Sequence, residues 1–407
     1  MYGAQLIEAL RRRAAELRSA GQPGAAVLTQ GLQLEFFGAG GERMRAAGCE
    51  IIVDAKDLAV VGITEVLSRL PKILGLYQKL IRSADEKRPA LAVVIDAPAF
   101  NWRVARQMGK RGIPVVYYVC PQFWAWRQGR AKLLRKYVNK ALVIFPFEEK
   151  FYRDRGVDAT FVGHPLADLP APAITREAYA ADQLDSAKQW ITLMPGSRRK
   201  EVRMNLPTIL EAADRLAAVR LAKDRLGGGY EFLLPVARTL DVSFIKELIA
   251  TPTETRQAAS LQENIHFVPE ALPALYHSRA GIVASGTATV EAAIMGTPFV
   301  MVYRVSALTY ALGKPRVKVP FFAMVNLIAE EEVVPELVQH KFTVENIVTE
   351  MNKIIPDGEP RARMIERLAT VKARLQGSRG GAHPSERAAE IILKQIQPRM
   401  NDASKNR

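Results

Sequence analysis

The sequence predicts an α/β protein built from two parallel-sheet domains, and three observations support that fold class. Short β-branched and aromatic runs alternate with longer segments whose apolar residues recur at helical spacing. The short runs are almost continuously apolar, as in strands that helices cover on both faces. The chain has 407 residues, of which 48% are hydrophobic, so two or three domains of ordinary size are expected.

The predicted strands run through most of the chain, and amphipathic segments separate many of them. One such segment carries Val66, Leu70, Ile73 and Leu74 at helical spacing. The strands are expected at residues 34–37, 50–53, 91–95, 115–119, 141–145, 160–162, 190–194, 231–234, 264–268, 280–284 and 298–302.

A change in composition marks the boundary between the two halves. The stretch from 165 to 186 is rich in proline, alanine and acids and has poor strand character. We therefore expect an N-terminal domain over 1–165 and a C-terminal domain over 166–375. Residues 376–407 read as a helical segment, expected to pack on the N-terminal domain or on a partner subunit.

The net charge is +15, from 57 Lys and Arg against 42 Asp and Glu. This balance favours polyanionic partners, namely phosphorylated ligands, nucleic acid or an anionic membrane surface. The histidines are scattered and the two cysteines lie far apart, so no metal site is expected. The most apolar stretch, 280–303, contains Glu291 and is broken by glycines, so it reads as strand, helix and strand rather than as a membrane span.

One predicted strand, 91–95, ends on a carboxylate. Asp96 follows it directly, and a proline stands two positions later. In open α/β sheets ligands bind beyond the carboxyl ends of the strands. A carboxylate there can accept a proton from an attacking hydroxyl. The alternative is a loop aspartate that caps a helix beginning near Asn101.

The segment "LMPGSRRKEV" places a tight turn and several cations at the start of a predicted helix. The strand ends at Met194, Gly196 and Ser197 form the turn, and Arg198 leads into a first helical turn that includes Glu201. A helix start attracts anions, and arginine binds phosphate with two hydrogen bonds. Cations at that place oppose the helix dipole, so they indicate a bound anion. The alternative is a solvated basic loop.

The segment "ASGTATVEAAIMG" is the second phosphate-type loop. The strand 280–284 leads into Ser285, Gly286 and Thr287, and the helix that follows carries Glu291 about one turn in. Small hydroxyl residues and glycine suit a diphosphate, and the carboxylate could accept hydrogen bonds from a ribose. The segment matches neither common phosphate-binding signature. The alternative is a plain helix cap.

Two further stretches could contact a surface. The stretch 60–77 has a wide apolar face with basic flanks, which suits a membrane interface or acyl chains, although a core helix is the commoner case. The stretch 121–140 interleaves aromatic with basic residues, as in proteins that bind single-stranded nucleic acid. Its alternative is an amphipathic helix with Leu133, Leu134 and Val138 in the core.

Taken together, the motifs resemble those of lipid-A-disaccharide synthases, in the same order and over nearly the whole chain. The tryptophan-rich "PQFWAWR" is the most specific of them. The motifs are "GGERMRAAGCE", "DLAVVGITEVLSRLPKI", "VVIDAPAFN", "YYVCPQFWAWRQGR", "FPFEEKFY", "FVGHPLAD", "LMPGSR", "ASGTATVEAA" and "VNLIAEEEVVPELVQ".

The resemblance implies two Rossmann-like domains facing a cleft (the GT-B fold) and an inverting glycosyltransferase. Such an enzyme joins UDP-2,3-diacylglucosamine to 2,3-diacylglucosamine 1-phosphate, giving the β(1→6) lipid A disaccharide 1-phosphate and UDP. It implies no cofactor and no metal, in keeping with the lack of an Asp-x-Asp motif. It also implies a cytoplasmic protein, peripheral on the anionic inner face of the inner membrane of a Gram-negative cell, and a possible homodimer.

The resemblance also assigns roles by motif. Asp96 matches the base that acts on the acceptor hydroxyl, and the C-terminal domain matches the UDP-sugar-binding half. The residues matched to substrate or nucleotide binding are Gly196, Ser197, Arg198, Glu201, Ser285, Gly286, Thr287, Glu291 and Asn326. The residues matched to an acyl-chain or membrane-facing surface are Val61, Ile63, Leu67, Leu70 and Leu74.

The start of the chain departs from the family pattern. Family members begin with a strand and a Gly-Glu-x-Ser-Gly-Asp loop, whereas Met1 falls where that loop would have just ended. The first strand of the N-terminal domain is therefore expected to be missing, through a late start-codon assignment, which we favour, or through loss. A missing central strand would leave strand edges unpaired and put the activity of this chain in question.

Other functions stay open at this point. A UDP-sugar 2-epimerase of the same fold would act on water-soluble UDP-N-acetylglucosamine alone, and a truncated member could be inactive. A nucleic-acid-binding module ranks last, because it leaves the two phosphate-type loops without a purpose. No nucleic-acid partner is therefore expected.

Overall fold

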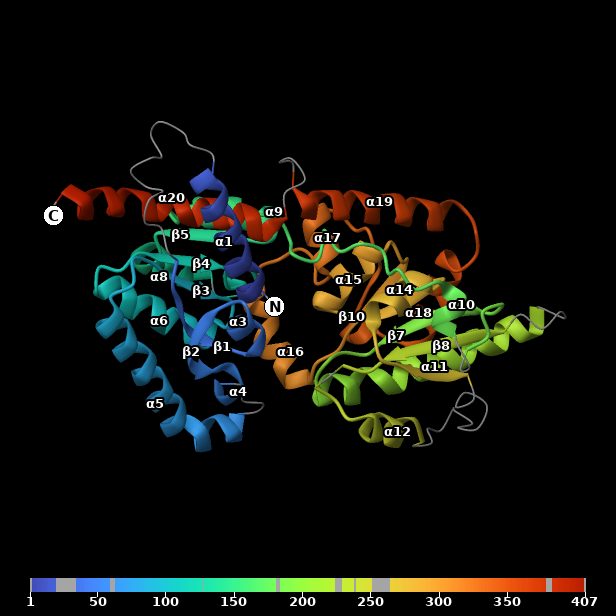
Figure 1. The fold of residues 1–407 in the computed structure, drawn as a ribbon. Coiled ribbons are helices and arrows are strands. Elements are labelled where there is room, and N and C mark those ends of the chain that lie inside the picture. The colour runs from blue at the N-terminus through green and yellow to red at the C-terminus, as the bar shows by residue number, and fades with distance from the viewer. Residues whose placement is uncertain are drawn as a thin grey trace. The chain divides into compact units, whose positions relative to one another are not determined.

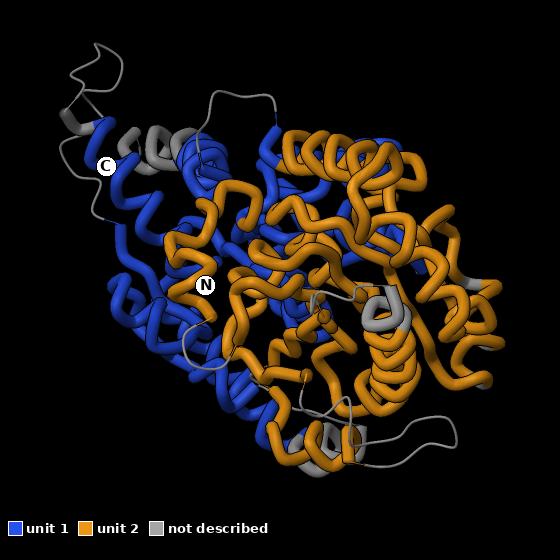
Figure 2. The backbone as a smooth tube through the Cα atoms, turned by 90° about the vertical axis from the view of Figure 1, so that its right-hand side faces the viewer, with its two compact units in different colours: residues 1–165, 376–407 blue, residues 166–375 orange. Residues whose placement is uncertain are grey.

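The computed structural model describes residues 2–19, 34–58, 63–126, 128–180, 184–223, 229–237, 239–250, 264–377 and 383–405. The chain divides into two compact units (Figure 2). Unit 1 is 1–165 with 376–407, and unit 2 is 166–375. In each unit the described strands pair in parallel, with helices between them in sequence (Figure 1). The predicted α/β class is therefore confirmed.

The described residues of unit 1 form two parallel sheets. The larger sheet has the order β3-β4-β5-β6, and β1 pairs with β2 in the smaller one. Each strand predicted for this half is present, with small shifts at its ends. The strands are β1 (Phe36–Gly40), β2 (Cys49–Asp54), β3 (Ala92–Ile95), β4 (Val115–Tyr118), β5 (Lys140–Val143) and β6 (Ala159–Phe161). The helices are α1 (Tyr2–Ser19), α3 (Glu42–Ala46), α4 (Ala55–Leu58), α5 (Ile63–Lys87), α6 (Pro98–Lys110), α7 (Phe123–Trp126), α8 (Ala131–Tyr137), α9 (Pro146–Arg153) and α20 (Pro384–Lys405).

The two ends of the described chain pack together in unit 1. Helix α1 buries Leu6, Ile7 and Leu10, which share one face, as helical spacing requires. It crosses α20 and packs against it (Figure 1). Arg12 reaches the Glu386 carboxylate at 2.5 Å, and Arg13 reaches it at 3.6 Å. The C-terminal helix therefore packs on the N-terminal domain of the same chain.

The aromatic stretch 121–140 belongs largely to the core of unit 1. Phe123 and Trp124 are buried, and so is Leu134, whereas Trp126 is exposed. Arg127 lies outside the described residues. A stacking platform for nucleic acid needs several exposed rings. The amphipathic alternative therefore describes this stretch better.

A buried carboxylate ties this stretch to the next helix. The Trp124 indole N–H donates to Glu148 Oε1 at 2.8 Å. The backbone N–H groups of Ile144 and Phe145 donate to Glu148 Oε2 at 3.3 and 3.2 Å. Burial outweighs these three hydrogen bonds and raises the pKa of Glu148 to about 7.

Unit 2 contains one six-stranded parallel sheet with the order β12-β11-β10-β7-β8-β9. The strands are β7 (Gln189–Met194), β8 (Tyr230–Pro235), β9 (Ile265–Val268), β10 (Ala280–Ala284), β11 (Phe299–Tyr303) and β12 (Glu336–Val338). The helices are α10 (Arg176–Ala180), α11 (Arg199–Lys223), α12 (Val242–Ala250), α14 (Ala271–His277), α15 (Thr287–Met295), α16 (Ala307–Gly313), α17 (Met324–Ala329), α18 (Val344–Ile354) and α19 (Glu359–Gln376). The stretch 280–303 forms the predicted strand, helix and strand. No described helix is long and apolar enough to cross a membrane.

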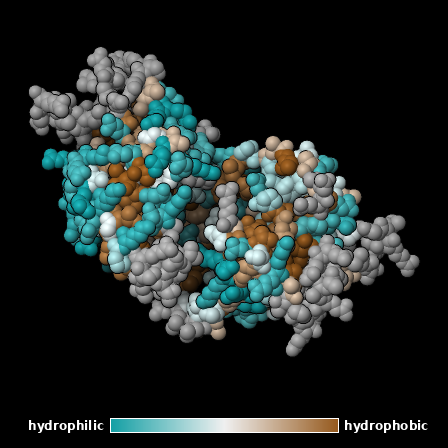
Figure 3. All heavy atoms as spheres, turned by 60° about the horizontal axis from the view of Figure 1, so that its bottom comes forward, coloured by the Kyte–Doolittle hydropathy of each residue, from teal (hydrophilic) through white to brown (hydrophobic). Residues whose placement is uncertain are grey.

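Helix α5 exposes part of its apolar face. The helix continues through Pro71, although proline there removes a backbone hydrogen bond. Leu70 is 43% exposed and Leu74 is 50% exposed, whereas Ile81 is buried nearer the end of the helix. Neither a fully buried helix nor a helix split at the proline fits these observations. Hydrophobic patches also interrupt the mostly hydrophilic surface on the face that Figure 3 shows.

The other positions predicted on this apolar surface give no test of it. Val61 lies outside the described residues, and so do the side chains of Ile63 and Leu67. Leu70 and Leu74 are therefore the two predicted positions whose exposure supports an acyl-chain or membrane-facing surface.

The raised pKa of Glu148 predicts a pH dependence of stability. The folded state favours the protonated carboxyl, so folding takes up a proton between the ordinary pKa of 4.5 and about 7. This contribution to stability is present below the ordinary pKa and is lost as the pH rises through the raised one. We expect the free energy of unfolding of the wild type, relative to Glu148→Gln, to fall from about pH 5 to about pH 8 in urea titrations. A constant difference across that range would contradict the assignment.

Candidate active site

The two phosphate-type loops of unit 2 leave neighbouring strands at the same edge of the sheet. Strand β7 pairs with β10, and Met194 lies opposite Val283. The chain adds β8 and β9 on one side of β7, then returns to its other side with β10, β11 and β12. The order therefore reverses between β7 and β10. Ligands of open α/β sheets bind at such a reversal, beyond the carboxyl ends of the strands.

The loop after β7 is built on a glycine in the left-handed region. Gly196 has φ +125°, and a Cβ there would lie 2.9 Å from both Cβ and Oε2 of Glu201. The turn is held from behind, where Asn205 Nδ2 donates to the Pro195 carbonyl at 2.9 Å and Thr239 Oγ1 donates to the Ser197 carbonyl at 2.7 Å. Only glycine fits this turn without moving Glu201.

The Glu201 carboxylate lies at the start of α11, in the place where a helix start binds an anion. Its Oε2 accepts the Ser197 backbone N–H at 3.3 Å, and its Oε1 lies 2.6 Å from the Arg198 guanidinium. The Arg198 side chain is 78% exposed, so the ion pair is open to solvent. A diphosphate that binds here has to take Arg198 and the Ser197 N–H from Glu201. The positive charge of Arg198 is therefore paired with the Glu201 carboxylate, so the loop is more than a solvated basic segment.

The loop after β10 uses its hydroxyl for anchoring. Ser285 Oγ donates to the Phe322 carbonyl at 2.9 Å, and the Ser285 N–H donates to the Val302 carbonyl at 2.9 Å. Gly286 has φ +138° and precedes α15 without a side-chain cap. The plain helix cap considered from the sequence is thus absent. The first N–H groups of α15 remain the donors that face a ligand, because a helix start leaves them unpaired.

Glu291 lies one turn into α15 as a half-buried carboxylate. Burial raises its pKa. It forms no hydrogen bond or ion pair with any residue that the structure describes. An acceptor that is partly desolvated and unsatisfied suits a ligand with two vicinal hydroxyls, as a ribose has.

Tyr303 interacts with the charged pair of the first loop and with Phe322, which anchors the second loop. This residue ends β11, and burial raises the pKa of its phenol, as does the negative charge of Glu201, whereas Arg198 lowers it. Its ring stacks on Phe322 with centroids 6.0 Å apart. Tyr303 is therefore influenced by the charges of the first loop and contacts Phe322, the residue that accepts the Ser285 hydroxyl. The sequence motifs did not single out Tyr303 or Phe322.

Asn326 is buried in α17 and uses its side chain within the protein. Its Oδ1 accepts the N–H groups of Val333 and Val334 at 2.9 and 3.0 Å. Its Nδ2 donates to the Val334 carbonyl at 2.9 Å and to Glu336 Oε1 at 3.0 Å. Asn326 thus presents no unpaired polar atom to a ligand. Its predicted place near the donor stays a prediction, and its side-chain amide forms hydrogen bonds with Val333, Val334 and Glu336.

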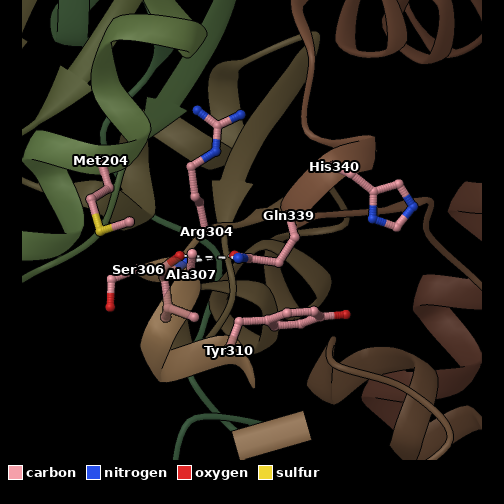
Figure 4. Close-up of a pocket in the computed structure, with 8 residues that line it drawn as sticks. Met204, Arg304, Ser306, Ala307, Tyr310, Gln339 and His340 are labelled. Atoms are coloured by element: carbon pink, nitrogen blue, oxygen red, sulfur yellow. Dashed lines mark hydrogen bonds between the residues drawn. The ribbon is translucent and has the colours of Figure 1, made fainter. Parts of the chain in front are cut away.

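A pocket of about 510 Å³ lies beyond the end of β11 (Figure 4). Two of its polar side chains, those of Gln339 and Arg304, form hydrogen bonds with nearby residues. Gln339 accepts the Val305 N–H at 2.7 Å and donates to the Val305 carbonyl at 3.0 Å. Arg304 bonds Thr208 Oγ1 at 3.0 Å and also the Phe342 carbonyl. Residues 304–305, which follow β11, are therefore hydrogen-bonded to the segment that follows β12.

In unit 1, Asp96 follows β3 with its side chain exposed. Its carboxylate forms no hydrogen bond or ion pair with any described residue. Helix α6 begins at Pro98, and its N-cap is Ala97, which makes no side-chain cap bond. Asp96 therefore does not cap the helix, and the helix begins before Asn101.

The backbone at Asp96 is held in a costly conformation. Asp96 has φ +50° and Ala97 has φ +42°, and a left-handed non-glycine residue costs about 1–2 kcal/mol. Asn101 Nδ2 donates to the Asp96 carbonyl at 2.8 Å, and Tyr117 OH donates to it at 2.9 Å. Burial raises the pKa of Tyr117, which keeps that donor protonated. These bonds fix the Asp96 backbone, while the residue itself is exposed.

Comparisons with known proteins agree with one another. The family model described as lipid-A-disaccharide synthetase matches residues 2–392. The lipid-A-disaccharide synthase of Koribacter versatilis is 48% identical over 399 residues, covering 98% of this chain and 96% of the relative. The enzyme of the same name from Acidobacterium capsulatum is 45% identical over 404 residues, covering 98% and 94%.

Solved structures show the fold. The glycotransferase of kitacinnamycin superposes with a TM-score of 0.58 at 16% identity, covering 97% of this chain and 96% of that one. The UDP-GlcNAc 2-epimerase from Neisseria meningitidis, bound to UDP-GlcNAc, superposes with a TM-score of 0.51 at 13% identity, covering 90% and 100%. Transferases and epimerases thus share this architecture.

The geometry of the first loop predicts a specific effect of Gly196→Ala. The added Cβ meets Glu201 and the backbone is left-handed, so we expect a loss of more than about 1 kcal/mol in the free energy of unfolding, together with weaker UDP binding in calorimetry. Gly296→Ala is the matched control, because φ is +74° there and nothing lies within 4 Å of the added atom. If both variants bind UDP like the wild type, the loop does not contact the diphosphate.

Proposed function

The chain belongs to the lipid-A-disaccharide synthase family and is a glycosyltransferase, and from this premise we propose that it forms the lipid A disaccharide. The donor is UDP-2,3-diacylglucosamine and the acceptor is 2,3-diacylglucosamine 1-phosphate. The observation that carries the proposal is the match of relatives with that name over 98% of the chain. The two loops beside the strand-order reversal in unit 2 support it as a place for UDP.

The reaction needs a base and a place for the departing diphosphate. The primary hydroxyl oxygen of the acceptor attacks the anomeric carbon of the donor, and the bond from that carbon to the β-phosphate oxygen breaks. UDP leaves with the electron pair, and the hydroxyl proton passes to the base. Attack from the side opposite the leaving group inverts the anomeric carbon.

We assign the base to Asp96. Its carboxylate is exposed and pairs with no described residue, so no described partner holds it back from the acceptor hydroxyl. Its backbone is fixed by Asn101 and Tyr117, which limits how far the carboxylate can move. A positioned base contributes about 10²–10⁴-fold to a rate.

We assign the stabilisation of UDP to the edge of unit 2. The starts of α11 and α15 lie at the ends of neighbouring strands, and helix starts favour phosphate. Arg198 is long and exposed, so it can turn from Glu201 to the diphosphate. Glu291 accepts the ribose hydroxyls in this arrangement. Charge stabilisation of a leaving group is commonly the largest catalytic effect.

We place the protein on the anionic inner face of the inner membrane as a peripheral enzyme. Both substrates carry acyl chains, so the enzyme has to reach them at a membrane surface. The net charge of +15 and the exposed leucines of α5 support this place.

Replacement of the base tests the chemistry. We expect Asp96→Asn to lower the rate of UDP release from the two acylated sugars by about 10²–10⁴-fold, because the amide cannot take the proton. The affinity for UDP, measured by calorimetry, should stay unchanged, since Asp96 lies in the other unit. Asp57→Asn, on an exposed carboxylate paired with Lys72 at 2.6 Å, serves as the control. Equal rates for the wild type and Asp96→Asn would refute the assignment, and absence of turnover by the wild type would refute the proposed function.

Replacement of the exposed leucines tests the membrane surface. We expect the double variant Leu70→Glu and Leu74→Glu to lose binding to vesicles of phosphatidylglycerol and phosphatidylethanolamine in sedimentation assays, because it removes apolar area and adds negative charge. Ile365→Glu, on a similarly exposed residue of α19, is the control and should bind like the wild type. Equal binding by the wild type and the double variant would exclude α5 as the membrane contact.

A further inference from the structure

A carboxylate on β12 holds the segment that precedes α17. Glu336 Oε1 accepts the Ala323 backbone N–H at 2.8 Å and Asn326 Nδ2 at 3.0 Å. The Phe322 N–H reaches both carboxylate oxygens, at 2.9 and 3.0 Å. The half-buried Glu336 is therefore satisfied by donors alone. Hydrogen bonds to an ionised acceptor are about twice as strong as neutral ones.

The segment that Glu336 holds is the anchor of the loop after β10. The Phe322 carbonyl accepts the Ser285 hydroxyl at 2.9 Å, and the Phe322 ring stacks on Tyr303. A shift of the 322–323 backbone therefore moves both Ser285 and Tyr303. Ser285 immediately precedes Gly286, whose neighbours at the start of α15 supply the N–H donors for an anion.

The charge of Glu336 is essential to this arrangement. Each hydrogen bond that its two oxygens form with described residues comes from an N–H donor. A glutamine would bring an N–H₂ group against one of those donors, and the buried donor left without an acceptor would push the segment away. Glutamate and glutamine are nearly the same size, so Glu336→Gln acts through hydrogen bonding rather than packing.

We propose that Glu336 is a positioning residue of the nucleotide site, which acts through Phe322 on Ser285 and Tyr303 and never touches the ligand. This inference rests on the proposed function for the identity of the ligand, UDP. In this arrangement Glu336 on the edge strand β12 holds the loop after β10, which lies two strands away in the sheet.

Calorimetry of UDP binding to the full chain tests the proposal. We expect Glu336→Gln to weaken UDP binding by at least about tenfold well below the melting temperature. Glu231→Gln is the control, because Glu231 is also a buried carboxylate of unit 2 that accepts a backbone N–H, from Asp185 at 3.0 Å. Glu231 lies near the amino-terminal end of β8, whereas the two loops leave the carboxyl ends of their strands. This variant should lose stability and keep its UDP affinity.

A double-mutant cycle separates positioning from a general loss of structure. If Glu336 acts through Ser285, the double variant Ser285→Ala with Glu336→Gln should bind UDP about as weakly as the weaker single variant. Losses that multiply would overturn the proposed route. If Glu336→Gln does not fold, Glu336→Asp replaces it in both experiments, since it keeps the charge and withdraws it by one methylene.

Hydrogen exchange of the free protein makes the inference independent of the ligand. We expect amides of 285–288 to exchange faster in Glu336→Gln than in the wild type, and unchanged in Glu231→Gln. Unchanged exchange at 285–288 in Glu336→Gln overturns the inference whatever the UDP result. A wild type that binds no UDP, with faster exchange in Glu336→Gln, defeats the proposed function and leaves the positioning role standing.

Discussion

The parallel pairing of β7 with β10 is the constraint on which the candidate site of unit 2 depends. Two segments far apart in the chain, 195–201 and 285–291, become neighbours only because their strands lie side by side with Met194 opposite Val283. Both strands run the same way, so both loops and both helix starts emerge at one edge. The two positive helix ends therefore act on the same region of space.

Near the carboxyl ends of these strands, the polar side chains of Ser285 and Asn326 form hydrogen bonds within the protein. Ser285 gives its only hydroxyl proton to Phe322, and Asn326 uses both ends of its amide on the backbone and on Glu336. The donors that we assign to a ligand are backbone N–H groups at the two helix starts and the exposed Arg198. The backbone donors of a helix start are held by the helix before the ligand arrives, whereas Arg198 first has to leave Glu201.

Much of this architecture follows from local sequence patterns. The predicted strands were found because long apolar β-branched runs have few other uses in a protein of this size. Strand β12 escaped prediction because it has three residues and begins with Glu336, whose charge argues against a sheet core. The position of Asp96 at a strand end followed from the strand before it.

The partners of these residues could not be predicted in the same way. Tyr117 lies on the neighbouring strand and reaches Asp96 only through the pairing of β3 with β4. The sequence also gave no sign that Glu201 closes on Arg198, since spacing alone fits a basic loop that awaits an anion equally well. Asn326 carried a family role, but its burial depends on the turn that follows α17.

In the proposed UDP site, the ion pair between Arg198 and Glu201 disfavours any anion that does not replace its contacts. Any anion that enters has to break a contact of 2.6 Å and then sits near a displaced carboxylate. Inorganic phosphate, with one phosphoryl group and no sugar, recovers little of that cost. A nucleoside diphosphate recovers it through the second phosphoryl group and the ribose, so we expect the proposed site to favour it over inorganic phosphate by a modest factor, since an exposed ion pair contributes only about 0–1 kcal/mol.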